Sequence, residues 1–326
     1  MFRFCLAAVL TFGLATAAGA EQDPPRDWTW EWTETDFSRA SVPFAEIFSG
    51  GVRKDGIPAL DSVVMLPATE DRELQGPEPV VTVEIEGAVP RAYPIRYLTW
   101  HEIVNDDTAA FPIAVTFCPL CNSALVFDRR VGGEVLDFGV SGKLRFSDMV
   151  MYDRQTESWW QQFTGEAIVG EMLGTQLTSV VNWMESFDAF LERNPDGLVM
   201  QRPQGFTRAY GANPYAGYDS SGWPFLFRGE TPPHGIAPLA RVIRVEERAW
   251  PLERLSRQEE ITEAGVTITW DAGMTSALDG RDIAASRDVG QIRVRDAQSG
   301  ADLVHEVVFA FAFHAFLPDG EWMLGE

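Results

Sequence analysis

The chain has 326 residues, of which 45% are hydrophobic and 12% aromatic, a composition typical of a folded globular protein and unlike a disordered one. This length is enough for one large domain or two ordinary domains with well-filled cores, so the fold needs no disulfide framework. The formal net charge of −22 would repel phosphate backbones, and we therefore expect no nucleic-acid partner.

Residues 1–20 have the pattern of a secretory signal peptide. Arg3 precedes an apolar stretch over residues 5–15, and small residues at 18–20 form a cleavage site. We predict cleavage before Glu21, which places the mature protein in the periplasm or outside the cell. No later segment reaches the roughly 20 uninterrupted apolar residues of a spanning helix, so we expect no permanent membrane span.

Residues 21–55 form a polar N-terminal arm. Trp28, Trp30 and Trp32 alternate along it, which is typical of a strand that packs one face on a core. A turn signal at 54–58 ends the arm, and we expect a first half at residues 56–230. Within it, residues 80–85 predict a strand and residues 98–105 a short helix.

The two cysteines that remain in the mature chain lie in one turn, Cys118-Pro119-Leu120-Cys121. A predicted strand at 113–117 leads into this turn, and another at 124–127 leaves it. A glycine pair at 132–133 then predicts a hairpin. Two thiols at this spacing can form a disulfide, pass electrons as a dithiol, or bind one soft metal ion. The turn is therefore the candidate functional site.

Two segments of the first half recur further along the chain. Arg91-Ala-Tyr-Pro matches Arg248-Ala-Trp-Pro, each after a predicted strand, and residues 116–125 align without a gap on residues 269–278. This alignment places Asp271 and Met274 at the positions of the two cysteines. We therefore predict a β-rich α+β fold of two related, duplicated halves in one compact unit, the second, degenerate half being residues 231–326. If the second copy folds without thiols, the cysteines serve chemistry rather than the fold.

Several longer motifs resemble a known family. They include WHEIVND at residues 100–106, TFCPLCNSALVFD at 116–128 and VMYDRQTES at 150–158. Together they are similar to a widespread bacterial and archaeal family of exported proteins of unknown function, from about residue 36 to about residue 319. The resemblance implies an exported protein with a CxxC turn after a WHE segment, and it brings no established activity.

The leading hypothesis is a soft-metal site. Cys118 and Cys121 supply two sulfurs, His101 is the candidate third ligand, and Met151 could add a thioether. Sulfur with imidazole favours Cu(I) or zinc, for metal handling or metal-dependent chemistry. Other acidic residues, Asp148 among them, are expected to be mostly solvated surface. Further candidate site residues are Glu102, Asp128, Arg129 and Asp153.

Two alternatives remain open at this point. The first is a thiol-disulfide oxidoreductase that works on a redox partner protein. A strand rather than a helix follows the turn, so His101 or Arg129 would have to stabilise the thiolate. The second is a non-catalytic binding protein for a small molecule such as a sugar or peptide. Because only the first two hypotheses involve chemistry, the sequence leaves open whether the protein is an enzyme. The cleft of the binding hypothesis would be lined by Trp159, Trp160, Tyr210, Tyr215 and Tyr218.

Overall fold

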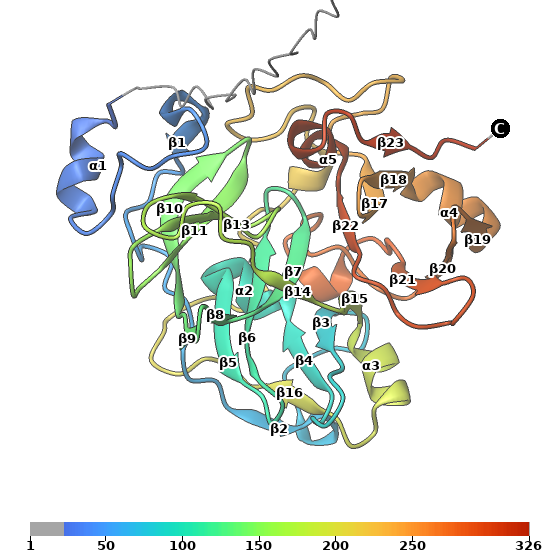
Figure 1. The fold of residues 1–326 in the computed structure, drawn as a ribbon. Helices are drawn as coiled ribbons and strands as arrows, with labels where there is room; N and C mark the ends of the chain where they lie inside the picture. The colour runs from blue at the N-terminus through green and yellow to red at the C-terminus, as the bar shows by residue number, and fades with distance from the viewer. Residues whose placement is uncertain (1–22, 326) are drawn as a thin grey trace, which may run out of the picture.

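The computed structural model describes residues 23–325. The predicted signal peptide at residues 1–20 lies outside the described residues. Short strands dominate the described chain, and they form five sheets of three to five strands with one small two-stranded ribbon. The five sheets are arranged as the blades of a five-bladed β-propeller (Figure 1).

Three sheets come from the part of the chain before residue 201. The first sheet has the order β1 (Ile47–Ser49), β10 (Phe138–Arg145), β11 (Asp148–Asp153), β12 (Trp159–Gln161), β13 (Glu166–Val169). The second has the order β14 (Thr178–Val180), β7 (Ser123–Asp128), β6 (Pro112–Cys118), β5 (Ile103–Asp107). The third has the order β15 (Asn182–Ser186), β3 (Pro79–Val83), β4 (Arg91–Pro94), β16 (Leu198–Met200), β2 (Met65–Pro67).

The remaining two sheets follow residue 240. The fourth has the order β22 (Glu306–Phe309), β17 (Arg241–Val245), β18 (Arg248–Pro251), β23 (Glu321–Trp322). The fifth has the order β19 (Glu260–Glu263), β20 (Val266–Asp271), β21 (Gln291–Asp296). The two-stranded ribbon pairs β8 (Arg130–Val131) with β9 (Glu134–Val135) around the predicted glycine turn.

Five short α-helices accompany the strands within residues 23–325. They are α1 (Arg26–Glu31), α2 (Ile95–His101), α3 (Phe187–Arg193), α4 (Leu252–Gln258) and α5 (Ala310–Phe316). Both α2 and α4 begin directly after a proline, Pro94 and Pro251, which ends the preceding strand and cannot donate a hydrogen bond within it. The expected helix at 98–105 is therefore shifted: α2 ends at His101 and β5 follows.

The prediction of an α+β fold with two duplicated halves is wrong. Helix makes up only 14% of the chain, and the five blades carry the architecture. The recurring Arg-Ala-aromatic-Pro segment marks a strand that passes into a seven-residue helix, β4 into α2 and β18 into α4. A local strand–helix unit shared by two sheets thus accounts for this match in sequence.

The second aligned segment has different backbones in its two places. Cys118 and Ser123 pair across β6 and β7, so only four residues separate the strands. After Asp271 ends β20, by contrast, β21 begins only at Gln291. Asp271 and Met274 therefore do not form a turn that corresponds to the cysteine turn, and the inference that the thiols are dispensable for folding loses its basis.

The N-terminal arm is helical where the sequence predicted a strand. Trp28 and Trp32 are buried from one face of α1 and its end, while Trp30 is 85% exposed. Both buried rings pack on Trp159 of β12, with ring centroids 5.1 and 5.3 Å away. The arm thereby covers the first sheet with a small core of its own.

The main buried cluster extends from Ala59 to Phe313 and includes residues of both predicted halves. Both cysteines belong to it, so the candidate site lies in the interior rather than on an exposed loop. Within residues 23–325, none of the helices has the length and apolar character needed to cross a bilayer.

Candidate metal centre

The cysteine turn is a tight β-hairpin connection at the end of the second sheet. Cys121 N donates to the carbonyl of Cys118 at 3.2 Å, and Asn122 closes the turn with φ +54°. Asparagine tolerates this left-handed conformation better than most residues. Cys118 is 1% exposed and Cys121 is fully buried. The prediction of a strand–turn–strand setting for this segment is thus confirmed.

Three hydrogen bonds from other parts of the chain hold this turn. Phe309 N donates to the Cys121 carbonyl at 2.9 Å, and the Asn122 amide donates to the Val307 carbonyl at 2.7 Å. From a different loop, the Tyr218 hydroxyl donates to the Leu120 carbonyl at 3.0 Å. Because two of these bonds fix backbone carbonyls of the turn and the third fixes the Asn122 side chain, the two thiols have defined positions.

A second hairpin turn lies over the thiols. Arg145 and Asp148 pair across β10 and β11, leaving Phe146 and Ser147 as a two-residue turn with φ +50° and +66°. Such a turn is usually built from Asn-Gly, so two side chains in this conformation store strain. The Ser147 carbonyl lies 3.9 Å from Cys118 Sγ and 3.5 Å from Cys121 Sγ.

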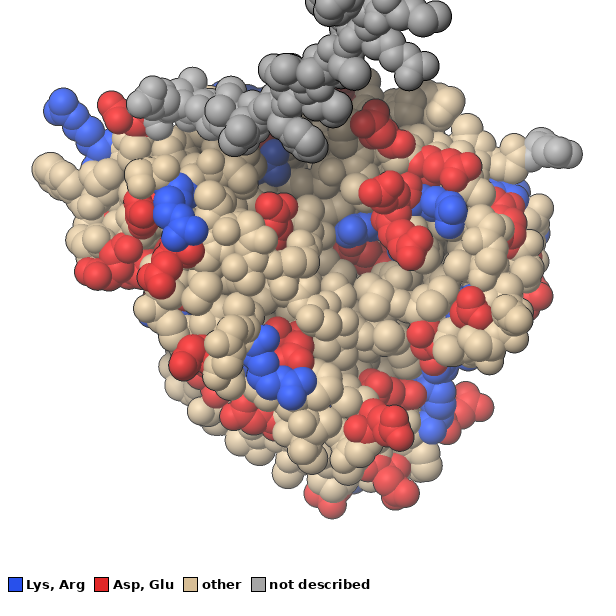
Figure 2. Space-filling view, viewed as in Figure 1, with Lys and Arg blue, Asp and Glu red and all other residues tan. Residues whose placement is uncertain are grey.

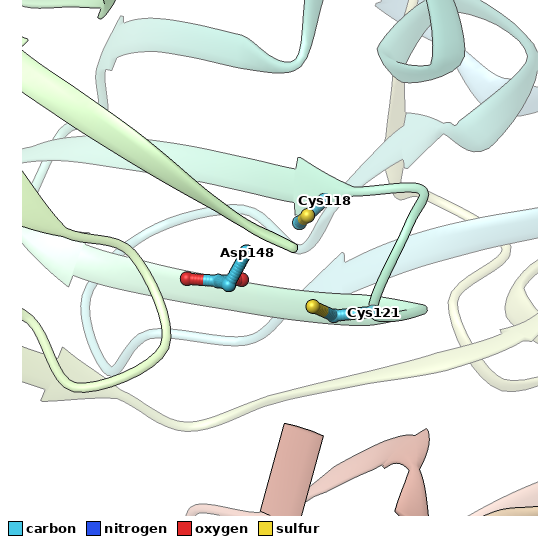
Figure 3. A group of neighbouring side chains, drawn as sticks. All are labelled: Cys118, Cys121 and Asp148. Carbon is cyan, nitrogen blue, oxygen red and sulfur yellow. The ribbon is translucent and has the colours of Figure 1, made fainter. Parts of the chain in front are cut away.

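Asp148, which directly follows that turn, completes a cluster with the two thiols (Figure 3). One carboxylate oxygen and the two Sγ atoms all lie within 4.8 Å of one another. Asp148 Oδ1 accepts hydrogen bonds from Gln161 Nε2 at 2.6 Å and from Phe163 N at 3.0 Å. Asp148 Oδ2 is buried and has no hydrogen-bond partner among the described residues.

The cluster holds its protons strongly in the metal-free protein. Burial raises the pKa of Cys118 and raises that of Cys121 well above its usual range, and the negative charge of Asp148 acts in the same direction. Burial likewise raises the pKa of Asp148 to about 7. The charged neighbours that act on the thiols are themselves acidic, so thiolates here require a cation from outside the chain.

Glu102 is a second buried carboxyl near the cluster. It follows α2 with φ +60°, and its carbonyl accepts a hydrogen bond from Phe117 N at 2.8 Å. Burial, together with the charge of Asp148, raises its pKa to about 8, while a hydrogen bond from the Tyr215 hydroxyl acts in the opposite direction. A buried acid in a strained backbone conformation is a common feature of functional sites.

His101 is buried, but both of its ring nitrogens have other partners. Nδ1 lies 2.7 Å from the Pro58 carbonyl and therefore carries the proton, since a carbonyl can only accept. Nε2 then accepts from the Tyr210 hydroxyl at 2.6 Å. Burial lowers the pKa of His101, which keeps this neutral tautomer. The cluster that the structure brings together contains Asp148 in the place where the sequence suggested His101.

The other candidate residues have structural partners. Met151 is buried opposite Trp160 in the first sheet. Asp128 and Arg129 lie at the end of β7 remote from Cys121, where Asp128 pairs with Arg130, and Arg129 with Asp107 and Asp137. Asp153 accepts from Thr156 N at 2.6 Å and from Trp160 Nε1 at 2.8 Å.

The expectation that Asp148 belongs to the solvated surface is wrong, since its side chain is fully buried. One feature of the sequence indicates this burial: Asp148 lies between Phe146 and the apolar run Met149-Val150-Met151, where a surface acid would be unusual. Among the aromatic residues proposed for a cleft, Trp159 and Trp160 are fully buried in the core. Tyr215 and Tyr218, in contrast, line a cavity next to the cysteine turn.

Comparison with known proteins gives a family but no activity. Residues 54–320 match the family described as protein of unknown function DUF3179. The chain matches no curated protein and no solved structure. The match covers most of the chain and includes the cysteine turn, Asp148 and Glu102, so the chain belongs to the DUF3179 family of proteins of unknown function.

Proposed function

We propose that the protein binds one zinc ion through Cys118, Cys121 and Asp148. The observation that carries the proposal is the buried Oδ2 of Asp148, which lacks a hydrogen-bond partner and belongs to a cluster with both thiols. An unpartnered buried carboxylate oxygen costs free energy in a folded protein unless something binds it. A metal ion between the three side chains would satisfy that oxygen and both sulfurs together.

The spacing of the three ligand atoms suits a zinc ion. Zinc–sulfur bonds of about 2.3 Å in a tetrahedral site place two sulfurs within about 3.8 Å of each other. The present separations of up to 4.8 Å need only small side-chain rotations to reach this geometry. Gln161 and Phe163 N already orient the carboxylate through Oδ1, as outer-shell groups do for metal ligands.

The donor set favours zinc over Cu(I). Two thiolates and a carboxylate carry three negative charges, which a divalent cation offsets better than a monovalent one. Carboxylate oxygen is also a harder ligand than the imidazole or thioether that would suit Cu(I). Three protein ligands leave one position for water or a substrate, which is the pattern of catalytic zinc sites. The N-terminal leader predicts that this chemistry takes place outside the cytoplasm.

The direct test is the zinc content of protein isolated from the compartment to which it is exported, by elemental analysis together with a free-thiol count. We expect about one equivalent of zinc, and loss of it in Cys118→Ser and in Asp148→Asn. Asp148→Asn keeps an Oδ1 for Gln161 and Phe163, so it removes the charge with little change in packing.

Two further variants complete this test. Asp128→Asn removes an acid at the far end of β7, and His101→Gln changes the histidine that has other partners; both are expected to retain zinc. Folded wild-type protein that takes up no zinc would contradict the proposal. Loss of zinc in His101→Gln, with Asp148→Asn unaffected, would contradict the ligand set.

One observation favours a second function, thiol-disulfide exchange. Asp148 lies beside both sulfurs, so its carboxylate could accept the Cys121 proton while that thiol attacks a disulfide, without a free thiolate. Formation of a Cys118–Cys121 disulfide would then pass two electrons to a partner's disulfide and convert it to two thiols. The burial of both sulfurs argues against contact with a partner protein. Equilibration with glutathione would show a defined dithiol potential only if this second function is correct.

A further inference from the structure

A cavity of about 510 Å³ is lined in part by neighbours of the cysteine cluster, although none of the three proposed zinc ligands lines it. Three of its lining residues are sequence neighbours of the proposed zinc ligands or bond to their strand. Leu120 stands between the two cysteines, and Met149 follows Asp148. Glu102 accepts a backbone hydrogen bond from Phe117, which precedes Cys118. Leu120, Met149 and Glu102 thus connect the wall of the cavity to the segments that carry the cluster.

The lining of the cavity is largely apolar. Besides Leu120 and Met149 it includes Val52, Ile57 and Val140, and two aromatic rings, Tyr215 and Tyr218, come from the loop that follows residue 211. The volume is in the range of cavities that bind small molecules, which are lined by apolar and aromatic groups with a few polar ones. Aromatic walls of this kind favour a ligand that carries a ring of its own.

The charged groups of the cavity disfavour an ionic ligand. The Lys143 ammonium is 3.1 Å from Glu31 and needs no further anion. The Glu102 carboxyl is buried and interacts with the Tyr215 hydroxyl, so it is not free to pair with a cationic ligand. With Lys143 already paired and Glu102 buried against Tyr215, neither an anion nor a cation finds a free counter-charge in the lining.

The loop that covers the cavity is tied to both turns of the cluster. The Tyr218 hydroxyl donates to Leu120 of the cysteine turn and accepts from Phe225 N at 3.3 Å. The Ser147 hydroxyl, in the turn over the thiols, donates to the Phe225 carbonyl. Phe225 itself is half exposed at the rim. A ligand that displaces this loop would therefore disturb the hydrogen bonds that tie it to both turns of the cluster.

We propose that this cavity binds a small, uncharged, ring-containing molecule next to the zinc, and that it is the substrate chamber of the proposed site. The role as a substrate chamber deepens the proposed zinc function and depends on it. The binding itself rests on the cavity alone. Leu120 and Met149, which line the cavity, are sequence neighbours of all three proposed ligands.

The test uses prodan, a neutral fluorescent naphthyl ketone, added to the zinc-loaded protein. We expect saturable, blue-shifted emission with a dissociation constant on the order of 10 μM. Neutral 2-acetonaphthone should displace the probe, whereas 2-naphthoate and 2-naphthyltrimethylammonium, which carry the same ring with a negative or positive charge, should not. Displacement by either ion at least as strong as by the ketone would overturn the uncharged class.

Two matched variants locate the binding site. Val52→Trp fills the cavity from a half-buried wall and should weaken prodan binding about tenfold or more, while Val89→Trp adds the same ring at an exposed position outside the cavity and should not. Both variants should keep their zinc. Equal binding to wild type and Val52→Trp would overturn the cavity inference and leave the zinc proposal standing.

Removal of the metal separates the two proposals further. Because the cavity adjoins the cluster, chelation of zinc should change prodan affinity by about threefold or more. An affinity that is the same with and without bound zinc would overturn the role as substrate chamber. If the isolated protein takes up no zinc but still binds prodan in a Val52-dependent way, the zinc function fails while ligand binding in the cavity holds.

Discussion

The buried carboxyl of Asp148 lowers the stability of the folded protein at neutral pH when no cation is bound. Its ordinary pKa of 3.8 is raised to about 7 in the folded protein, and the pKa of Glu102 is raised from 4.5 to about 8. The unfolded chain therefore releases these protons at lower pH than the folded chain. Where the folded state binds more protons, its stability falls as pH rises.

We therefore predict that the metal-free protein loses several kcal/mol of stability between about pH 4 and pH 8, since each unit of pKa shift corresponds to about 1.4 kcal/mol. Urea unfolding in the presence of a chelator measures this slope. The double variant Asp148→Asn, Glu102→Gln should unfold with a much flatter pH dependence over the same range. A wild-type slope that persists unchanged in the double variant would assign the effect to other groups.

Sequence reasoning at the scale of single residues found the two thiols but not their partner. Cys118 and Cys121 stand out because no other cysteine lies outside the predicted signal peptide. Asp148 is one of 48 acidic residues, and only the fold places it beside the thiols. His101 precedes the turn at a plausible ligand spacing, yet spacing along the chain does not show which way a ring faces or which carbonyl it meets.

At the scale of elements, the spacing of tryptophans in the N-terminal arm fits both the period of a strand and the period of a helix. Three tryptophans at every second position suit a strand, but positions 28 and 32 also share one face of a helix. The structure buries Trp28 and Trp32 and exposes Trp30, so the helical period decides the packing. A six-residue helix is stable here because it packs on the first sheet rather than through its own propensity.

The arm gives a prediction with an internal control. Trp32→Ala removes a buried ring that packs on Tyr152 and Trp159, and we expect it to lower the free energy of unfolding by about 3–5 kcal/mol. Trp30→Ala should change the free energy of unfolding by no more than about 0.5 kcal/mol. Chemical denaturation compares the two. Equal losses would mean that both side chains pack, as they would on one face of a strand but not in this helix.

At the scale of the molecule, acidic side chains are spread over the surface. Figure 2 shows them scattered across one face, with Lys or Arg beside several of them. The sequence carries 48 acidic against 26 basic residues, so even complete pairing leaves a large negative excess. This excess favours solubility but destabilises the compact state through repulsion between like charges.

We expect added salt to stabilise the fold. Raising NaCl from about 10 mM to about 100 mM shortens the screening length from about 30 Å to about 10 Å. The melting temperature should rise by a few degrees, whereas sucrose of equal osmolarity should not reproduce the same steep dependence at low concentration. A melting temperature that falls over this range would show that ion pairs outweigh the repulsion.

The sequence predicted the β-rich character and the hairpin around the thiols, and it missed the architecture. A short repeated segment suggested two halves, because the sequence where β4 passes into α2 is nearly the same as the sequence where β18 passes into α4. The order of sheets depends on contacts between strands far apart in the chain, such as β1 with β10 and β17 with β22. Local patterns carry no information on those pairings.

The bond between Phe309 N and the Cys121 carbonyl joins the turn to β22, near the C-terminal end of the chain. Asn122 and Ser123 bond to the same strand through Val307 and Glu306. During synthesis, these bonds can form only after almost the whole polypeptide has been made. A newly made chain therefore completes the contacts around its thiol-bearing turn only when this late strand docks.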